Sequence, residues 1–144
     1  MDNIKKERDE YLAGWQRAKA DFLNYKKEAV EKMEVFGDMI KTEQVLECLP
    51  ILDNLEMAVS HLTEKQKKDP VMKGFLQITE RFKKILKSQG IEEIKTLGKK
   101  FDSTVHEAVG EVKGGKAGIV IEEVQKGYMK NGVLIRVAQV KVGK

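Results

Sequence analysis

The chain has 144 residues, of which 41% are hydrophobic and 35% are charged, so it is long enough for one domain but richer in charge than most compact globules. Its net charge is +4, yet Lys and Arg are interspersed with Asp and Glu instead of forming the basic block that binds nucleic acid or membranes. No segment approaches the roughly 20 apolar residues that span a bilayer, and the N-terminus lacks an apolar signal core. We therefore expect a soluble protein with an extended helical part.

Residues 1–49 carry the clearest periodicity in the chain. Apolar residues recur there at steps of three and four, which is the spacing of one stripe on a helix that packs in a coiled coil. The stripe comprises Ile4, Tyr11, Trp15, Ala18, Phe22, Tyr25, Ala29, Met33, Phe36 and Ile40. A rod of roughly 70 Å, at about 1.5 Å per residue, cannot bury this stripe against the short remaining chain, so we expect it to pair in parallel with a second copy. The predicted dimer contacts in this rod are its larger members, Tyr11, Trp15, Phe22, Tyr25, Met33, Phe36 and Ile40.

The seam of this rod is imperfect. Arg8 occupies a stripe position, and Gly14 and Gly37 each cost about 1 kcal/mol of helix propensity relative to Ala. Two successive steps of four after Tyr25 would also unwind the supercoil locally. We expect the rod to be among the first parts of the protein to melt.

Residues 50–90 have the pattern of a helical hairpin. Pro50 is expected to end or kink the first helix, because proline lacks an N–H and disfavours α geometry in the preceding residue. A polar stretch at 63–69 is predicted to be a loop, with Asp69 capping a second helix that ends at Gly90. Both helices have one apolar face, and two copies would close a four-helix bundle. The dimer contacts predicted for this bundle are Leu52, Leu55, Val59, Phe75, Ile78 and Phe82.

Residues 91–144 change from helical to alternating periodicity and predict a small β domain. Four strands are expected, at 91–94, 105–112, 119–125 and 133–142. The glycine-rich segment around Gly114 and the Asn131-Gly132 pair are predicted turns. The last strand is hydrophobic on both faces, so we expect it to be central in its sheet. The predicted fold class is α+β, divided into a dimerising helix (1–49), a helical hairpin (50–90) and a β domain (91–144).

Catalytic or metal chemistry has little support in the sequence. Gly114-Gly115-Lys116 lacks the spacing and the strand–loop–helix context of a phosphate-binding loop. His61 and His106 do not stand at metal-ligand spacing with each other or with Cys48, and we expect His61 to face solvent. The single cysteine excludes an intramolecular disulfide and is predicted to be an inert, partly buried thiol in a reducing compartment. We expect no enzyme activity, no metal and no cofactor.

The C-terminal third contains a long motif. It runs from Phe101-Asp102 and His106-Glu107-Ala108-Val109 through Gly127-Tyr128 and Asn131-Gly132 to Ile135-Arg136-Val137-Ala138 and Val140-Lys141-Val142. This motif resembles the C-terminal signature of the GrpE family, the nucleotide exchange factors of DnaK-type chaperones, and the likeness extends over almost the whole chain. The resemblance implies a homodimer with a paired long helix, a four-helix bundle and a β domain. It also implies that one β domain docks on the chaperone's ATPase domain and opens the nucleotide cleft, so that ADP leaves.

The resemblance also implies which residues contact the chaperone. On the long helix they are Asn24, Lys26 and Lys27, and on the second bundle helix Gly74. In the β domain they are Phe101, Val124, Val133, Arg136 and Val142, although Phe101 and Val142 could equally be core and Arg136 could organise the fold. Relatives often have a basic residue where Val133 stands, so a charge-assisted contact of about 1.5–3 kcal/mol would be lost here unless Lys130 or Arg136 replaces it.

We expect a bacterial cytoplasmic protein, with an organelle matrix as the alternative. The mechanism would be differential binding, with no direct contact to the nucleotide and no nucleic-acid or membrane partner. Melting of the imperfect rod would reduce exchange on heating. A competing hypothesis is a coiled-coil adaptor that binds nucleic acid or anionic lipid through its basic rod, and strongly salt-dependent DNA binding would favour it.

Overall fold

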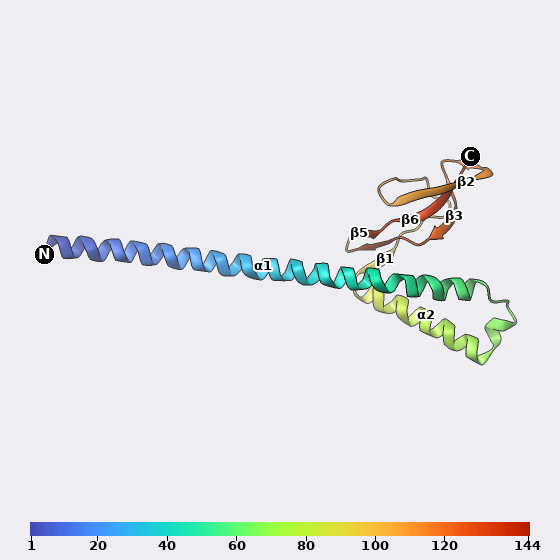
Figure 1. Ribbon diagram of the computed structural model, residues 1–144, viewed down its shortest axis with the longest axis horizontal. Helices are drawn as coiled ribbons and strands as arrows, with labels where there is room; N and C mark the ends of the chain where they lie inside the picture. The colour runs from blue at the N-terminus through green and yellow to red at the C-terminus, as the bar shows by residue number, and fades with distance from the viewer. The chain divides into compact units, whose positions relative to one another are not determined.

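The computed structural model describes all 144 residues. They divide into two compact units, Met1–Glu43 and Gln44–Lys144. Two α-helices precede six β-strands in chain order (Figure 1). The long N-terminal helix, the second helix and the β region give the α+β fold that the periodicity predicts. None of the helices combines the length and the apolar character that a membrane span requires.

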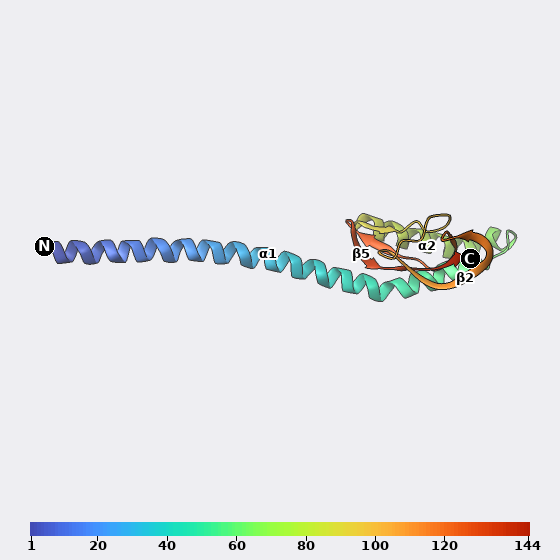
Figure 2. The same cartoon turned by 90° about the horizontal axis from the view of Figure 1, so that it is seen from above.

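Helix α1 spans Asp2–Ser60 and contains Pro50 in its interior (Figure 2). Of the two outcomes expected at Pro50, an end of the helix does not occur. Proline removes one backbone hydrogen bond, but Leu49 and Leu52 on either side of it are completely buried. Their packing holds the chain in helical geometry through a residue that would end an isolated helix. In the unit Met1–Glu43 no side chain is buried.

Helix α2 spans Pro70–Ser88 and begins as the sequence predicts. The Asp69 side chain accepts hydrogen bonds from the backbone N–H groups of Val71 (2.8 Å) and Met72 (3.3 Å), and Pro70 occupies the first helical position. The helix stops before Gly90, whose φ of 77° is readily adopted only by glycine. The loop between the helices contains a short 3₁₀ turn, η1, at Gln66–Lys68.

Six strands form two three-stranded sheets. The first sheet has the order β1-β4-β5 and consists of Ile91–Glu93, Tyr128–Lys130 and Val133–Arg136, all antiparallel. The second has the order β2-β6-β3 and consists of His106–Ala117, Ala138–Gly143 and Val120–Gln125. Within it, β6 is parallel to β2 and antiparallel to β3.

Two of the strand predictions need correction. The single strand expected at 133–142 is divided at Val137, because the chain leaves the first sheet there and enters the second. Only β6 is central, as predicted for the whole segment, whereas β5 is an edge strand. The three-residue β4 was not predicted, because it is too short to show alternation.

The two predicted turns differ in outcome. Asn131 and Gly132 have φ values of 48° and 82° and connect β4 to β5, as a hairpin turn of this sequence should. The glycine-rich segment is instead part of β2. Val112 and Ala117 both pair with Gly143, so the residues between them bulge out of the ladder.

Two hydrophobic clusters stabilise the unit Gln44–Lys144. The first, called the helix–sheet cluster, comprises Val45, Leu49, Leu52, Leu86, Ile91 and Tyr128, with Phe82 and Ile135 packed against it. The second, called the sheet cluster, comprises Val120, Ala138 and Val140, with Phe101 and Val142 packed against it. Only the helix–sheet cluster includes helical residues, so it attaches the first sheet to α1 and α2.

Candidate functional site

Arg136 lies at the end of β5 and connects the β region to helix α1. Its guanidinium donates to both carboxylate oxygens of Asp53, from Nη1 at 2.7 Å and from Nη2 at 2.8 Å. The side chains are only 14% and 22% exposed, so this bidentate pair is shielded from the solvent that weakens surface ion pairs. Nε and Nη2 also donate to the carbonyl of Lys126, at 2.9 and 2.7 Å.

Lys126 forms a second ionic connection between the same elements. Its ammonium lies 3.1 Å from Glu56 on α1 and 2.9 Å from Glu93 on β1, and Glu56 also pairs with Lys83 of α2 at 2.7 Å. Burial acts to lower the pKa of Lys126, but the bonds to Glu93 and Glu56 outweigh it and raise the pKa above its ordinary value. The ammonium therefore stays charged and linked to both carboxylates.

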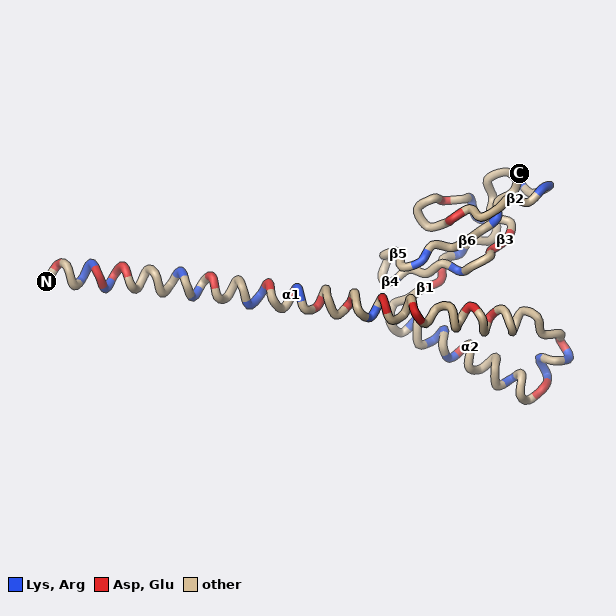
Figure 3. Tube along the Cα trace, in the orientation of Figure 1, with Lys and Arg blue, Asp and Glu red and all other residues tan.

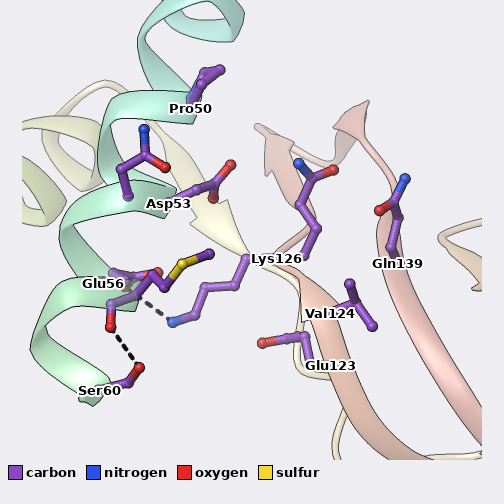
Figure 4. Close-up of a pocket in the computed structure, with 11 residues that line it drawn as sticks. Pro50, Asp53, Glu56, Ser60, Glu123, Val124, Lys126 and Gln139 are labelled. Carbon is purple, nitrogen blue, oxygen red and sulfur yellow. Dashed lines mark hydrogen bonds and ion pairs between the residues drawn. The ribbon is translucent and has the colours of Figure 1, made fainter.

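A pocket of about 530 Å³ opens beside these ion pairs, between α1 and the β region (Figure 4). Asp53, Glu56 and Ser60 come from successive turns of α1, and Val124, Lys126 and Gln139 come from the strand side. Figure 4 shows the Lys126 side chain reaching across to Glu56. The pocket lining combines the charged side chains of Asp53, Glu56, Glu123 and Lys126 with the apolar ones of Pro50, Met57 and Val124.

Tyr128 on β4 lies under Arg136 in the helix–sheet cluster. The guanidinium carbon is 5.3 Å from the centre of its ring, which is within cation–π range. Its hydroxyl is buried and has no hydrogen-bond partner. Burial raises the pKa of this phenol strongly, and the charges of Glu56, Glu93 and Asp53 add to the effect.

His106 is buried at the start of β2 and accepts a hydrogen bond at Nδ1 from the backbone N–H of Asp102, at 3.1 Å. Its ring centre is 5.9 Å from that of Phe101. Asp102 in turn accepts bonds from the N–H and hydroxyl of Thr104, which lower its pKa. This arrangement organises the loop before β2.

The residues that the resemblance assigns to chaperone contact are placed very differently from one another. Val133 at the tip of the β4–β5 hairpin is 67% exposed, and Val124 on β3 is also exposed. Phe101 and Val142 pack against the sheet cluster, and Arg136 faces Asp53. The residues on the long helix, Asn24, Lys26 and Lys27, are exposed, and Gly74 is half-buried on α2.

The residues predicted for dimer contact are mostly exposed in the single chain. All seven in the rod are exposed, as are Phe75 and Ile78 on α2. Leu55 and Val59 are half-buried. Leu52 and Phe82 lie in the helix–sheet cluster of their own chain.

The predicted burial of Cys48 is wrong. The thiol is exposed, although Cys48 lies on α1 between the buried residues Val45 and Leu49. His61 is exposed, as expected.

Sequence reasoning missed Asp53, Glu56 and Lys126 as a connected group. A signal was present on α1, where Asp53 and Glu56 are spaced three apart beside the buried Leu52. Carboxylates beside an apolar face lose water when that face is buried, which favours a cationic partner, and Arg136 stands in an otherwise apolar strand. Asp53 and Arg136 are 83 positions apart in the sequence, so no local pattern could predict that they pair.

Comparisons with known proteins identify one family. The GrpE family model matches residues 1–144. The chain is 34% identical to Protein GrpE of Oceanobacillus iheyensis over 144 residues, which cover 98% of this chain and 75% of the relative. It is 36% identical to Protein GrpE of Bacillus velezensis over 128 residues, covering 88% and 67%. It is 34% identical to Protein GrpE of Fusobacterium nucleatum subsp. polymorphum over 146 aligned positions, covering 100% and 72%.

Proposed function

The chain belongs to the GrpE family, and from this premise we propose that it is the nucleotide exchange factor of a DnaK-type chaperone. The observation that carries the proposal is the family match across residues 1–144, which includes the helices as well as the C-terminal motif. The protein would bind the chaperone's ATPase domain, hold its cleft open and accelerate ADP release. By linkage, a partner that binds the open cleft more tightly must weaken nucleotide binding by the same factor.

We take the β4–β5 hairpin as the element that contacts the chaperone. Its tip carries the exposed apolar residues Val133 and Leu134. The tight turn at Asn131-Gly132 fixes the direction in which they project. Contact through this tip would be mainly apolar, because Val133 occupies the position where relatives often have a basic side chain.

The exposed apolar stripes support a homodimer. The rod exposes seven large side chains on one helical stripe, and α2 exposes Val71, Phe75, Ile78 and Ile85 at helical spacing. Monomeric proteins rarely leave contiguous apolar surface of this kind in water. A parallel partner would cover the rod, and a four-helix bundle would cover α2. The three parts 1–49, 50–90 and 91–144 would then serve pairing, bundle formation and chaperone contact.

The long helix would add temperature control. Asn24, Lys26 and Lys27 are exposed on it and would approach the chaperone, so melting of the paired helices would weaken the complex. Exchange would then decline on heating before the rest of the protein unfolds.

The test is release of fluorescent ADP from a DnaK-type chaperone, followed by stopped flow with excess unlabelled ATP. The informative variant is Val133→Glu, which places a charge at the exposed hairpin tip. Its matched control is Val109→Glu, because Val109 is an exposed valine (45%) on β2 of the same region. Circular dichroism and sedimentation check that both variants keep their fold and association state.

We expect the unmodified protein to accelerate release strongly, Val133→Glu to lose most of the acceleration and Val109→Glu to keep it. Equal activity of both variants would place the contact elsewhere in the β region. No acceleration of any DnaK-type chaperone by a folded dimer would overturn the exchange proposal.

A further inference from the structure

Arg136 connects both sheets to helix α1. It ends β5, immediately before the crossing at Val137 from the first sheet to the second. The Lys126 carbonyl that it binds lies at the crossing between β3 and β4. The same guanidinium holds Asp53 on α1. Two of the three places where the chain passes between the sheets are therefore tied to the helix through Arg136.

The crossing at Lys126 is so tightly packed that Gly127 cannot carry a side chain. A Cβ on Gly127 would lie 2.5 Å from the backbone nitrogen of Ala138, the first residue after the crossing at Val137. The two crossing segments are thus in direct contact, and glycine is required at one of them. The hydrogen bonds from Arg136 to the Lys126 carbonyl therefore hold the two crossing segments, and the sheets that they join, in one arrangement.

The second sheet shares no hydrophobic cluster with the helices, so its orientation depends on the polar links at the crossings, the Arg136–Asp53 and Lys126–Glu56 pairs. Its own cluster contains residues from the β region only, whereas the helix–sheet cluster reaches α1 and α2 through the first sheet. A hydrophobic cluster resists separation but is tolerant of small rotations, because dispersion and burial are non-directional. A bidentate guanidinium–carboxylate pair restricts rotation, because its two parallel bonds require both planes to be aligned.

We propose that Asp53 and Arg136 form a positioning clamp that sets the angle of the β region on the helices. The clamp rests on the proposed function, in which the hairpin tip at Val133 meets the chaperone. The β region can then push the cleft open only if it is held rigidly on the helices. Loosening the clamp leaves the contact residues of the tip intact, so it reduces cleft opening more than it reduces binding.

The kinetic test compares Arg136→Lys, Asp53→Asn and the double variant in the ADP-release assay, across a range of concentrations of the exchange factor. Arg136→Lys keeps the charge but loses the two-bond fork, and Asp53→Asn keeps the shape but loses the charge. The control is Glu122→Gln, which removes the exposed pair with Lys141 at 3.1 Å on the same β region.

We expect the maximal rate of release to fall about tenfold in each single variant, since small misplacements of distant groups have effects of this order. The concentration for half-maximal effect should change less than about twofold, and the double variant should be no worse than either single one. Glu122→Gln should match the unmodified protein. A higher half-maximal concentration with an unchanged maximal rate, or additive losses in the double variant, would overturn the clamp.

A distance measurement tests the clamp without the chaperone. Spin labels are attached to Lys84→Cys on α2 and Ala108→Cys on β2, both exposed positions, in a Cys48→Ser background. Labelled protein is diluted with unlabelled protein so that only distances within one chain are recorded. Arg136→Lys and Asp53→Asn should broaden the distance distribution, and Glu122→Gln should not.

An unchanged distribution in the clamp variants would overturn the proposal even if their exchange is slow. Broadening in a protein that accelerates no DnaK-type chaperone would support the clamp and overturn the exchange function instead. The two failures are therefore distinguishable.

Discussion

Tyr128 carries a hydroxyl whose burial is not compensated by any hydrogen bond. A buried hydroxyl without a partner costs free energy, whereas the ring itself packs in the helix–sheet cluster and under Arg136. We therefore expect Tyr128→Phe to leave the free energy of unfolding at pH 7 unchanged or to raise it by about 1 kcal/mol. Urea unfolding followed by circular dichroism measures this. A loss of more than about 1 kcal/mol would show that the hydroxyl has a stabilising role.

The raised pKa of Tyr128 gives a second expectation, for alkaline pH. The phenol ionises in the unfolded chain near pH 10 and only at higher pH in the folded protein. Unfolding therefore releases a proton in this range, and the stability that is complete below about pH 10 declines as the pH rises further. The decline should be smaller in Tyr128→Phe than in the unmodified protein. Tyr25→Phe, at an exposed site, serves as the control and should follow the unmodified protein.

Helix α2 contains a glycine, Gly74, that packing within the single chain does not require. A Cβ on Gly74 would meet nothing within 4 Å, so Gly74→Ala should stabilise the helix by about 1 kcal/mol. If the chaperone approaches α2 closely at this point, the same methyl group should reduce exchange although the protein is more stable. Thermal unfolding and ADP release are measured on the same samples.

Gly37→Ala is the matched control, because a Cβ there also meets nothing within 4 Å. It should stabilise α1 and leave exchange unchanged. If Gly74→Ala also leaves exchange unchanged, Gly74 does not contact the chaperone.

The apolar face of α2 leads to a prediction about association. Phe75 is exposed in the single chain, and a four-helix bundle would bury it. Phe75→Asp places a charge in that interface and should convert the dimer to monomers in sedimentation velocity, because a buried unpaired charge is very costly. Gln77→Asp, an exposed change on the same helix, should stay dimeric. A dimer dissociation constant that Phe75→Asp leaves unchanged would mean that Phe75 lies outside the interface.

The elements differed in how well the sequence predicted them. The Asp69 cap, Gly90 and the Asn131-Gly132 turn were predicted because each depends on local chemistry within a few residues. The helix does not end at Pro50, one of the two outcomes expected there, because burial of Leu49 and Leu52 overrides the local preference. The division at Val137 and the pairing of Arg136 with Asp53 depend on where distant segments lie, and no local pattern records that.

For the molecule as a whole, the contrast in burial between the two units determines where heating acts first. No side chain in Met1–Glu43 is buried, whereas Gln44–Lys144 contains both hydrophobic clusters. A long helix without a core of its own is marginal in water unless it is paired. Gly14, Gly37 and Arg8 weaken the pairing that we propose for it.

We therefore expect two transitions in thermal circular dichroism at 222 nm, an early reversible loss of helix and a later cooperative one. Exchange should decline over the early transition. In a Cys48→Ser background, Trp15→Cys should form a disulfide between parallel partners when oxidised. This disulfide disfavours separation of the two paired helices. The oxidised protein should lose the early transition and keep its exchange activity at those temperatures. The reduced protein should keep the early transition. A single cooperative transition in the reduced protein would contradict early melting of the rod. If exchange still declines on heating in the cross-linked protein, melting of the rod is not the cause of that decline.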